Sequence, residues 1–287
     1  MEWDVIISGA GLGGLCAASG LSQAGIKVLV LEQDMSPLSR RQGYRININI
    51  AGDIALRECL SPAHYALYQD TSHRQLDPSV DIFSPDLMPI FHRAAEVPAS
   101  GPPPAAVDRS TLRAILLDAV PNVRFGLPVV DAIQKGNEVG VRLGDGTNVT
   151  CGLLIAADGA SSPLRRKLLP GYDPQPLGTI AIYGKTPLDT DRRTWLPCGV
   201  LQRRFVGVTD GAGTTLALGA WYPRRIPSEA ASVLVPSPRL PEVDPYAMWV
   251  LLVPSEAAPD PASSGGTASV RGGCPPGLGP GRHTICS

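Results

Sequence analysis

The sequence lacks an excess of charge of either sign. Its 25 Lys and Arg residues are matched by 26 Asp and Glu residues, so the formal net charge is -1. A chain without a broad basic surface is a poor partner for the phosphate backbone of a nucleic acid. Charged residues make up 18% and hydrophobic residues 44% of the 287 residues, which is typical of a globular protein. We expect a small-molecule partner and no nucleic acid.

Metal, disulfide and membrane patterns are also lacking. Six cysteines lie far apart in the sequence without a Cys-x-x-Cys pair, and no histidine lies at metal-ligand spacing. We therefore expect neither a metal site nor a disulfide framework. No run of about 18 apolar residues could span a bilayer. No basic segment precedes an apolar one at the amino terminus, so we expect a cytoplasmic location.

The amino terminus instead shows a β-α-β pattern. Residues 3–8 predict a strand, the following Ala- and Leu-rich stretch predicts a helix that ends near Gly25, and residues 27–31 predict a second strand. The second strand is continuously apolar, as in a parallel sheet buried on both faces. The first 30 or so residues thus predict one right-handed β-α-β unit.

Gly9, Gly11 and Gly14 lie between the first strand and the helix at the G-x-G-x-x-G spacing. This spacing serves a tight turn, close approach of a pyrophosphate and close packing of the helix on the strand. Glu32 ends the second strand, where a carboxylate can accept both ribose hydroxyls of an adenosine and disfavours a 2′-phosphate. The pattern predicts a site for FAD or NAD. The alternative is a glycine-rich turn that only lets the helix pack.

Two later motifs bear on the choice between FAD and NAD. Arg109-Ser110-Thr111-Leu112 begins a predicted helix over residues 110–120, and Asp158-Gly159 follows a predicted buried strand over residues 153–157. Together with the glycine motif they resemble the para-hydroxybenzoate-hydroxylase-like flavoprotein monooxygenases, an FAD-dependent aromatic-ring hydroxylase family. The resemblance implies that Arg109, Asp158 and Gly159 lie at bound FAD. A helix-start arginine and a helix-capping Asp-Gly turn are the structural alternatives.

The resemblance also implies the activity. Members are oxidoreductases that use FAD, NAD(P)H as a transient co-substrate, and O2 to hydroxylate or epoxidise a small hydrophobic or aromatic substrate, which suggests secondary metabolism here. It further implies that Arg41, in the segment 40–45, lies near the flavin ring, although a solvated basic loop is the alternative. No side chain is predicted as acid, base or nucleophile, because the cofactor carries the chemistry.

The predicted fold is α/β, with a Rossmann-like FAD-binding domain over residues 1–175 and a mainly antiparallel β-sheet substrate domain over residues 176–253. Strands are expected at residues 178–184, 200–208, 215–221 and 248–253. Residues 254–287 are rich in Ala, Pro, Gly and Ser, which predicts a disordered low-complexity tail.

The family's Gly-Asp motif is missing, so we expect a fold that is truncated at the carboxyl terminus. Two alternative functions stay open. A catalytically inactive flavoprotein remnant would bind no flavin productively. An NAD-dependent dehydrogenase would bind a nicotinamide cofactor without the Asp-Gly element.

Overall fold

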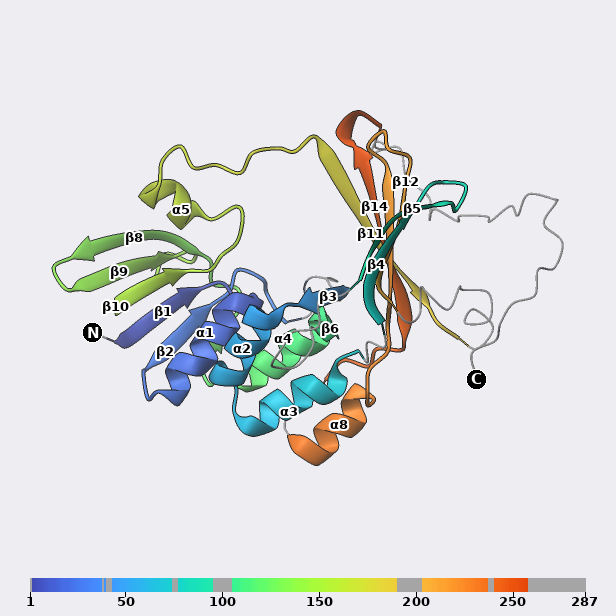
Figure 1. The fold of residues 1–287 in the computed structure, drawn as a ribbon. Helices are drawn as coiled ribbons and strands as arrows, with labels where there is room; N and C mark the ends of the chain where they lie inside the picture. The colour runs from blue at the N-terminus through green and yellow to red at the C-terminus, as the bar shows by residue number, and fades with distance from the viewer. Residues whose placement is uncertain are drawn as a thin grey trace. The chain divides into compact units, whose positions relative to one another are not determined.

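The computed structural model describes residues 2–37, 39, 43–73, 77–94, 105–189, 203–236 and 240–257. Its contacts divide the chain into two units (Figure 1). Unit 1 comprises residues 1–76, 96–175 and 221–246, and unit 2 comprises residues 77–95, 176–220 and 247–287. Each unit is therefore built from three separate segments of the chain.

Unit 1 contains a six-stranded sheet in the order β7-β2-β1-β10-β9-β8. Strand β1 pairs in parallel with β2 on one side and with β10 on the other, and β2 pairs in parallel with β7. Strands β8, β9 and β10 form an antiparallel meander. The strands are β1 (Trp3–Ser8), β2 (Val28–Leu31), β7 (Val123–Arg124), β8 (Val129–Lys135), β9 (Glu138–Leu143) and β10 (Asn148–Ala156).

Strand β10 corrects one sequence expectation. The buried strand expected over residues 153–157 begins earlier, at Asn148, and continues through Gly152. Its first half pairs antiparallel with β9, and from Cys151 onward it pairs in parallel with β1. A single glycine weakens a strand but does not end it when both neighbouring strands supply hydrogen bonds. This continuous strand carries Asp158 to the carboxyl edge of the parallel strands.

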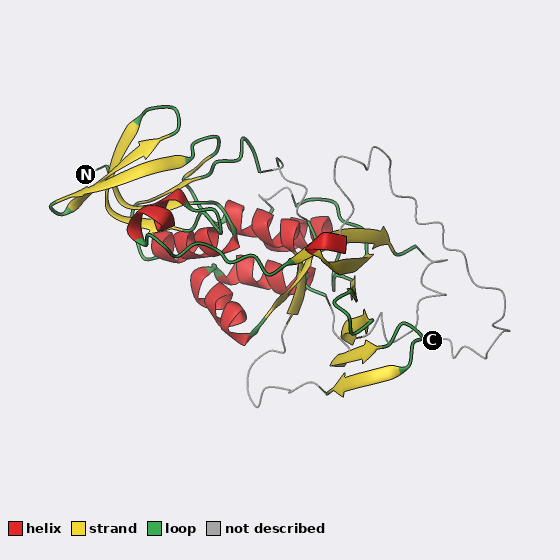
Figure 2. Cartoon of the chain, turned by 90° about the horizontal axis from the view of Figure 1, so that it is seen from above, coloured by secondary structure: helices red, strands yellow, loops and turns green. Residues whose placement is uncertain are grey.

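The helices of unit 1 gather mainly into one group beside the parallel strands, as Figure 2 shows in red. They pack on the sheet through a core that includes Val5, Ile7, Leu15, Val30 and Ile115. The helices are α1 (Leu12–Gln23), α2 (Ile50–Cys59), α3 (Pro62–Thr71), α4 (Arg109–Asp118), α5 (Pro163–Leu168) and α8 (Pro227–Leu234). A small antiparallel pair, β3 (Arg45–Ile48) and β6 (Ala105–Asp108), precedes α2 and α4.

Sequence signals explain where these helices begin. Helices α2 and α3 are separate, because Ser61 caps α3 and Pro62 occupies its first turn. Proline fits the first turn of a helix and disfavours helical geometry at the residue before it. Asp108 caps α4, and its Oδ1 accepts the backbone N–H groups of Ser110 and Thr111. This cap fixes the start of the helix that bears Arg109.

Unit 2 contains the second sheet, in the order β11-β14-β13-β12-β4-β5. Strands β12 and β13 pair antiparallel, as do β4 and β5, whereas β12 and β4 pair in parallel. The strands are β4 (Asp77–Phe83), β5 (Pro89–Arg93), β11 (Thr179–Pro187), β12 (Arg203–Thr209), β13 (Thr215–Trp221) and β14 (Tyr246–Pro254), and a short 3-10 helix η1 (Ser255–Ala257) follows. The α/β fold with a Rossmann-like part and a mainly antiparallel sheet is confirmed. Most of the expected tail, residues 258–287, lies outside the described residues.

Candidate dinucleotide-binding site

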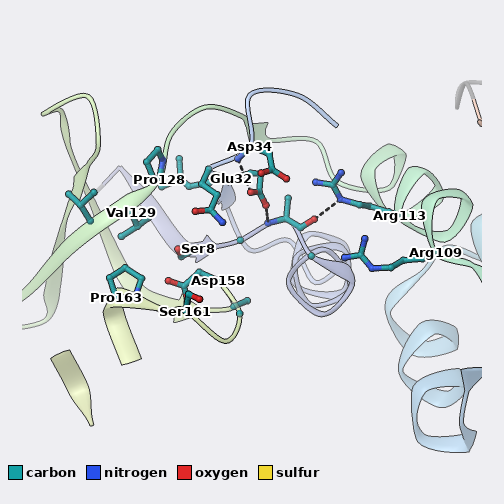
Figure 3. Close-up of a pocket in the computed structure, with 18 residues that line it drawn as sticks. Ser8, Glu32, Asp34, Arg109, Arg113, Pro128, Val129, Asp158, Ser161 and Pro163 are labelled. Carbon is teal, nitrogen blue, oxygen red and sulfur yellow. Dashed lines mark hydrogen bonds between the residues drawn. The ribbon is translucent and has the colours of Figure 1, made fainter. Parts of the chain in front are cut away.

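A pocket of about 320 Å³ lies at the carboxyl ends of the parallel strands of unit 1 (Figure 3). This is where ligands bind in open α/β sheets. Its walls come from five stretches of the chain that are distant in sequence. The lining residues are Ser8, Gly9, Ala10, Gly11, Leu31, Glu32, Gln33, Asp34, Arg109, Arg113, Pro128, Val129, Val130, Ala157, Asp158, Gly159, Ser161 and Pro163.

The three motif glycines have distinct roles. Gly9 has φ +106°, and a Cβ there would lie 2.4 Å from the carbonyl oxygen of Ala157. A Cβ on Gly14 would lie 2.2 Å from the carbonyl oxygen of Gly9, so this glycine lets α1 pack on the turn. By contrast, a Cβ on Gly11 would meet no atom within 4 Å, because this residue borders the pocket.

The amino terminus of α1 is suited to an anion. Gly11 is the N-cap residue and makes no side-chain hydrogen bond to the first turn of the helix. The first backbone N–H groups of a helix lack partners within the helix and lie at the positive end of its dipole. A pyrophosphate over Gly11 could therefore accept hydrogen bonds from the backbone without displacing a capping side chain.

Glu32 is 7% exposed and joins the glycine turn to the end of β2. Its Oε2 accepts the backbone N–H of Ala10 at 2.7 Å, and its Oε1 accepts the backbone N–H of Asp34 at 2.9 Å. Each carboxylate oxygen has a second lone pair. Glu32 can thus hold the turn and still accept two hydroxyl groups of a ribose.

Two arginines border the pocket from α4, one helical turn apart, on the side opposite Pro128, Val129 and Asp158 in Figure 3. Arg113 donates through Nε to the carbonyl oxygen of Ala10 at 3.0 Å and through Nη1 to that of Pro37 at 2.7 Å. The Arg109 side chain makes no hydrogen bond or ion pair with the residues that the structure describes. The two guanidinium groups therefore differ. Arg113 secures the glycine turn, whereas Arg109 can bind a ligand in the pocket.

Asp158 follows β10 and borders the pocket beside Gly159 and Ser161. Both of its carboxylate oxygens are buried, and neither has a hydrogen-bond partner among the described residues. Gly159 has φ +84°, the left-handed conformation that suits the turn before α5. A buried carboxylate without a donor is costly, so the geometry fits a ligand that supplies hydroxyl or N–H donors.

The structure thus brings Gly9, Gly11, Glu32, Arg109, Asp158 and Gly159 to one pocket, while Gly14 lies behind it and supports the turn. Arg41 lies outside the described residues. Sequence analysis missed Arg113, Asp34 and Ser161. Arg113 could have been predicted from the sequence, because a residue four positions after Arg109 lies on the same face of a helix.

The pocket is lined by charges of both signs. Carboxylates come from Glu32, Asp34 and Asp158, and the arginines come from α4. A dinucleotide has anionic phosphates, which suit the arginines, and neutral ribose hydroxyls, which suit the carboxylates. Within the described ranges, no group of three or more His, Cys, Asp or Glu residues could hold a metal ion, and no helix has the length and apolar character needed to cross a membrane.

Comparisons with known proteins agree with this geometry. The model of the NAD(P)-binding Rossmann-like domain matches residues 7–46. The dual O-methyltransferase/FAD-dependent monooxygenase elcB of Phaeosphaeria nodorum is 27% identical over 285 residues, which are 93% of this chain and 30% of that protein. The FAD-dependent urate hydroxylase of Klebsiella pneumoniae is 31% identical over 180 residues, 59% of this chain and 44% of that protein. The chain is a relative of the FAD-dependent monooxygenases.

Solved structures show the same fold. A Photorhabdus luminescens protein described as an FAD-containing monooxygenase superposes with a TM-score of 0.73 at 24% identity, covering 91% of this chain and 65% of its own. The family resemblance predicted from the sequence is confirmed. The chain spans 30% and 44% of the length of the two relatives named above.

Proposed function

We propose that this chain supplies the FAD-binding part of a monooxygenase that uses NAD(P)H and O2 to hydroxylate or epoxidise a small hydrophobic or aromatic molecule. The observation that carries the proposal is the convergence of the glycine turn, Glu32, Arg109 and Asp158 on one pocket. The relatedness to FAD-dependent monooxygenases supports the same cofactor. A cytoplasmic location and a substrate from secondary metabolism belong to the proposal.

Each residue has a stated task in holding the cofactor. The amino terminus of α1 at Gly11 would face the pyrophosphate, and Glu32 would accept the adenosine ribose hydroxyls. Arg109 would donate to oxygen atoms of the nucleotide. Asp158 would accept hydrogen bonds from the hydroxyl groups of the flavin side, because its oxygens have no other partner in the described structure. Bound FAD supplies the redox and oxygen chemistry, and these residues supply placement and electrostatics.

The test is binding of FAD to the purified chain. We expect FAD fluorescence to change on titration with the protein, with saturation at one FAD per chain, and we expect Asp158→Asn to weaken this binding about tenfold, which corresponds to about 1.4 kcal/mol. Glu138→Gln, on the outer hairpin away from this pocket, is the control and should bind as the natural chain does.

A second measurement concerns activity. NAD(P)H oxidation and O2 consumption that rise in the presence of FAD and an aromatic acceptor would support the monooxygenase. Tight binding of NAD⁺ without binding of FAD would instead identify a dehydrogenase. A folded chain that binds neither nucleotide would contradict the proposed function.

A further inference from the structure

Two cysteines that are 43 positions apart in the sequence meet where α1 packs on α2. Cys16 lies in the second turn of α1, and Cys59 is the last residue of α2. Their side chains are neighbours at this contact, since Cys16 Sγ reaches the carbonyl oxygen of Ala55 and Cys59 Sγ lies beside Gly20. Both side chains are partly accessible, and neither belongs to the pocket described above.

The packing of the two helices brings these thiols together. Cys16 Sγ donates to the carbonyl oxygen of Ala55 at 3.7 Å. Cys16 of α1 therefore contacts α2 one helical turn before Cys59. Gly20 lies one turn after Cys16 in α1, and a Cβ at Gly20 would approach Cys59 Sγ to 2.8 Å and its Cα to 3.5 Å. The missing side chain at Gly20 therefore lets the backbone of α2 come close to α1.

Polar contacts hold Cys59 in this position. Its carbonyl oxygen accepts the Ser19 hydroxyl and the Gln23 side-chain amide, both at 2.5 Å. Two side chains of α1 thus fix the end of α2 beside Cys16. Two thiols held on neighbouring turns of packed helices are in the arrangement from which a disulfide can form.

We propose that Cys16 and Cys59 form a thiol pair that a hydroperoxide oxidises to a disulfide joining α1 to α2. Cys59 attacks the peroxide, the O–O bond breaks, and Cys59 becomes a sulfenic acid while one water leaves. Cys16 then attacks the Cys59 sulfur, its proton joins the departing hydroxyl, and a second water leaves. In sum, two thiols and one hydrogen peroxide give one disulfide and two waters.

The environment of Cys16 makes it the less reactive thiol of the pair. Burial, together with the neighbouring Cys59, raises the pKa of the Cys16 thiol to about 12. Cys16 is therefore protonated at neutral pH, which leaves the first attack to Cys59 and slows the attack of Cys16 on the oxidised Cys59, since the thiolate is the reactive form in both steps. We expect a slow reaction, over minutes to hours, that a dithiol reductant reverses.

The experiment adds hydrogen peroxide to the purified chain, so its outcome does not depend on the proposed function. A background variant carries serine at Cys198, Cys274 and Cys286, which lie outside the described residues, and keeps Cys16, Cys59 and Cys151. Free thiols are counted after denaturation, and peptides are mapped without reduction. We expect the count to fall from three to one, with one peptide pair linked through Cys16 and Cys59.

Control variants in the same background separate the possible sources of thiol loss. With Cys59→Ala the count should stay at two, and with Cys151→Ser it should fall from two to zero. The natural chain, mapped directly, should give the same linked pair even if a variant folds poorly. Loss of thiols without this linked pair, a link through Cys151, or a link between two chains would each overturn the proposal.

Discussion

Gly13 and Gly14 are neighbours in α1 but have opposite surroundings. A Cβ on Gly14 would lie 2.2 Å from the backbone oxygen of Gly9, whereas a Cβ on the exposed Gly13 would meet nothing within 4 Å. Gly14→Ala must therefore shift the backbone of the turn, and we expect it to lower the free energy of unfolding by about 3 kcal/mol. Gly13→Ala should raise it by about 0.5 to 1 kcal/mol, because alanine favours the helix.

Urea unfolding of the two variants beside the natural chain measures this difference. The pair is matched in chemistry and differs by one position, so helix propensity cannot explain opposite signs. Equal stability of the two variants would show that α1 does not pack on the turn as described.

His73 gives the stability of the protein a pH dependence. Its side chain is 2% exposed, and its Nδ1 accepts the backbone N–H of Tyr222 at 2.7 Å. Burial, together with the positive charge of Arg45, lowers the pKa of His73 to about 4. Since the unfolded histidine titrates near 6.5, the unfolded state binds the proton first as the pH falls. We therefore expect the contribution of His73 to stability to be constant above about pH 6.5 and to fall by about 3 kcal/mol between about pH 6.5 and 4.

The variant His73→Asn tests this prediction, because the asparagine oxygen can accept the same N–H group and does not titrate in this range. Thermal unfolding of both proteins between pH 7 and 4.5 should show a steeper loss for the natural chain. Parallel curves would mean that His73 titrates as it does in water.

At the scale of elements, α4 carries two arginines whose roles can be told apart. Arg113 bonds the carbonyl oxygens of Ala10 and Pro37, whereas the Arg109 side chain has no such partner in the described part of the chain. Arg113→Met should lower the free energy of unfolding by about 2 kcal/mol, because two charge-assisted hydrogen bonds are lost. Arg109→Met should change it by less than about 0.5 kcal/mol.

The two variants should differ in FAD binding as well. We expect Arg109→Met to weaken FAD binding about tenfold at nearly unchanged stability, as befits a residue that contacts ligand and not protein. Calorimetric titration with FAD, beside urea unfolding, measures both quantities. Unchanged FAD affinity in Arg109→Met would show that this arginine is only a helix-start residue.

The elements that the sequence predicted are those specified by local pattern. The glycine spacing, the acidic end of β2 and the Asp-Gly turn each combine residue type with position along a strand or helix, so the candidate site could largely be anticipated. Local pattern does not encode which residues from distant segments come into contact. Arg113 bonds Ala10, which lies 103 positions earlier, and Cys16 lies beside Cys59, because α1 packs on both α2 and α4.

At the scale of the whole molecule, strands β4 and β5 show that local sequence pattern does not reveal which distant segments pair. They lie within residues that were expected to belong to the dinucleotide-binding part, yet β4 pairs with β12, more than 120 positions later. Each unit is assembled from three segments, so the chain passes between units several times. Two of these crossings fall inside strands, at residues 220–221 within β13 and at residues 246–247 within β14, so no turn or linker composition marks the boundary there.

The pocket draws its lining from segments spread over most of unit 1, and its occupancy can be followed by hydrogen exchange. Its walls are residues 8–11, 31–34, 109–113, 128–130 and 157–163. We expect FAD to slow backbone exchange in all five segments, because a bound ligand suppresses the opening of every segment that it contacts. ADP, which lacks the flavin and ribityl groups, should protect 8–11 and 31–34 and leave 157–163 unchanged. If FAD protected only the segments that ADP protects, Asp158 would not lie at the flavin side of the ligand, and the assignment of the pocket to a flavin would fail while the adenosine half of the site would remain.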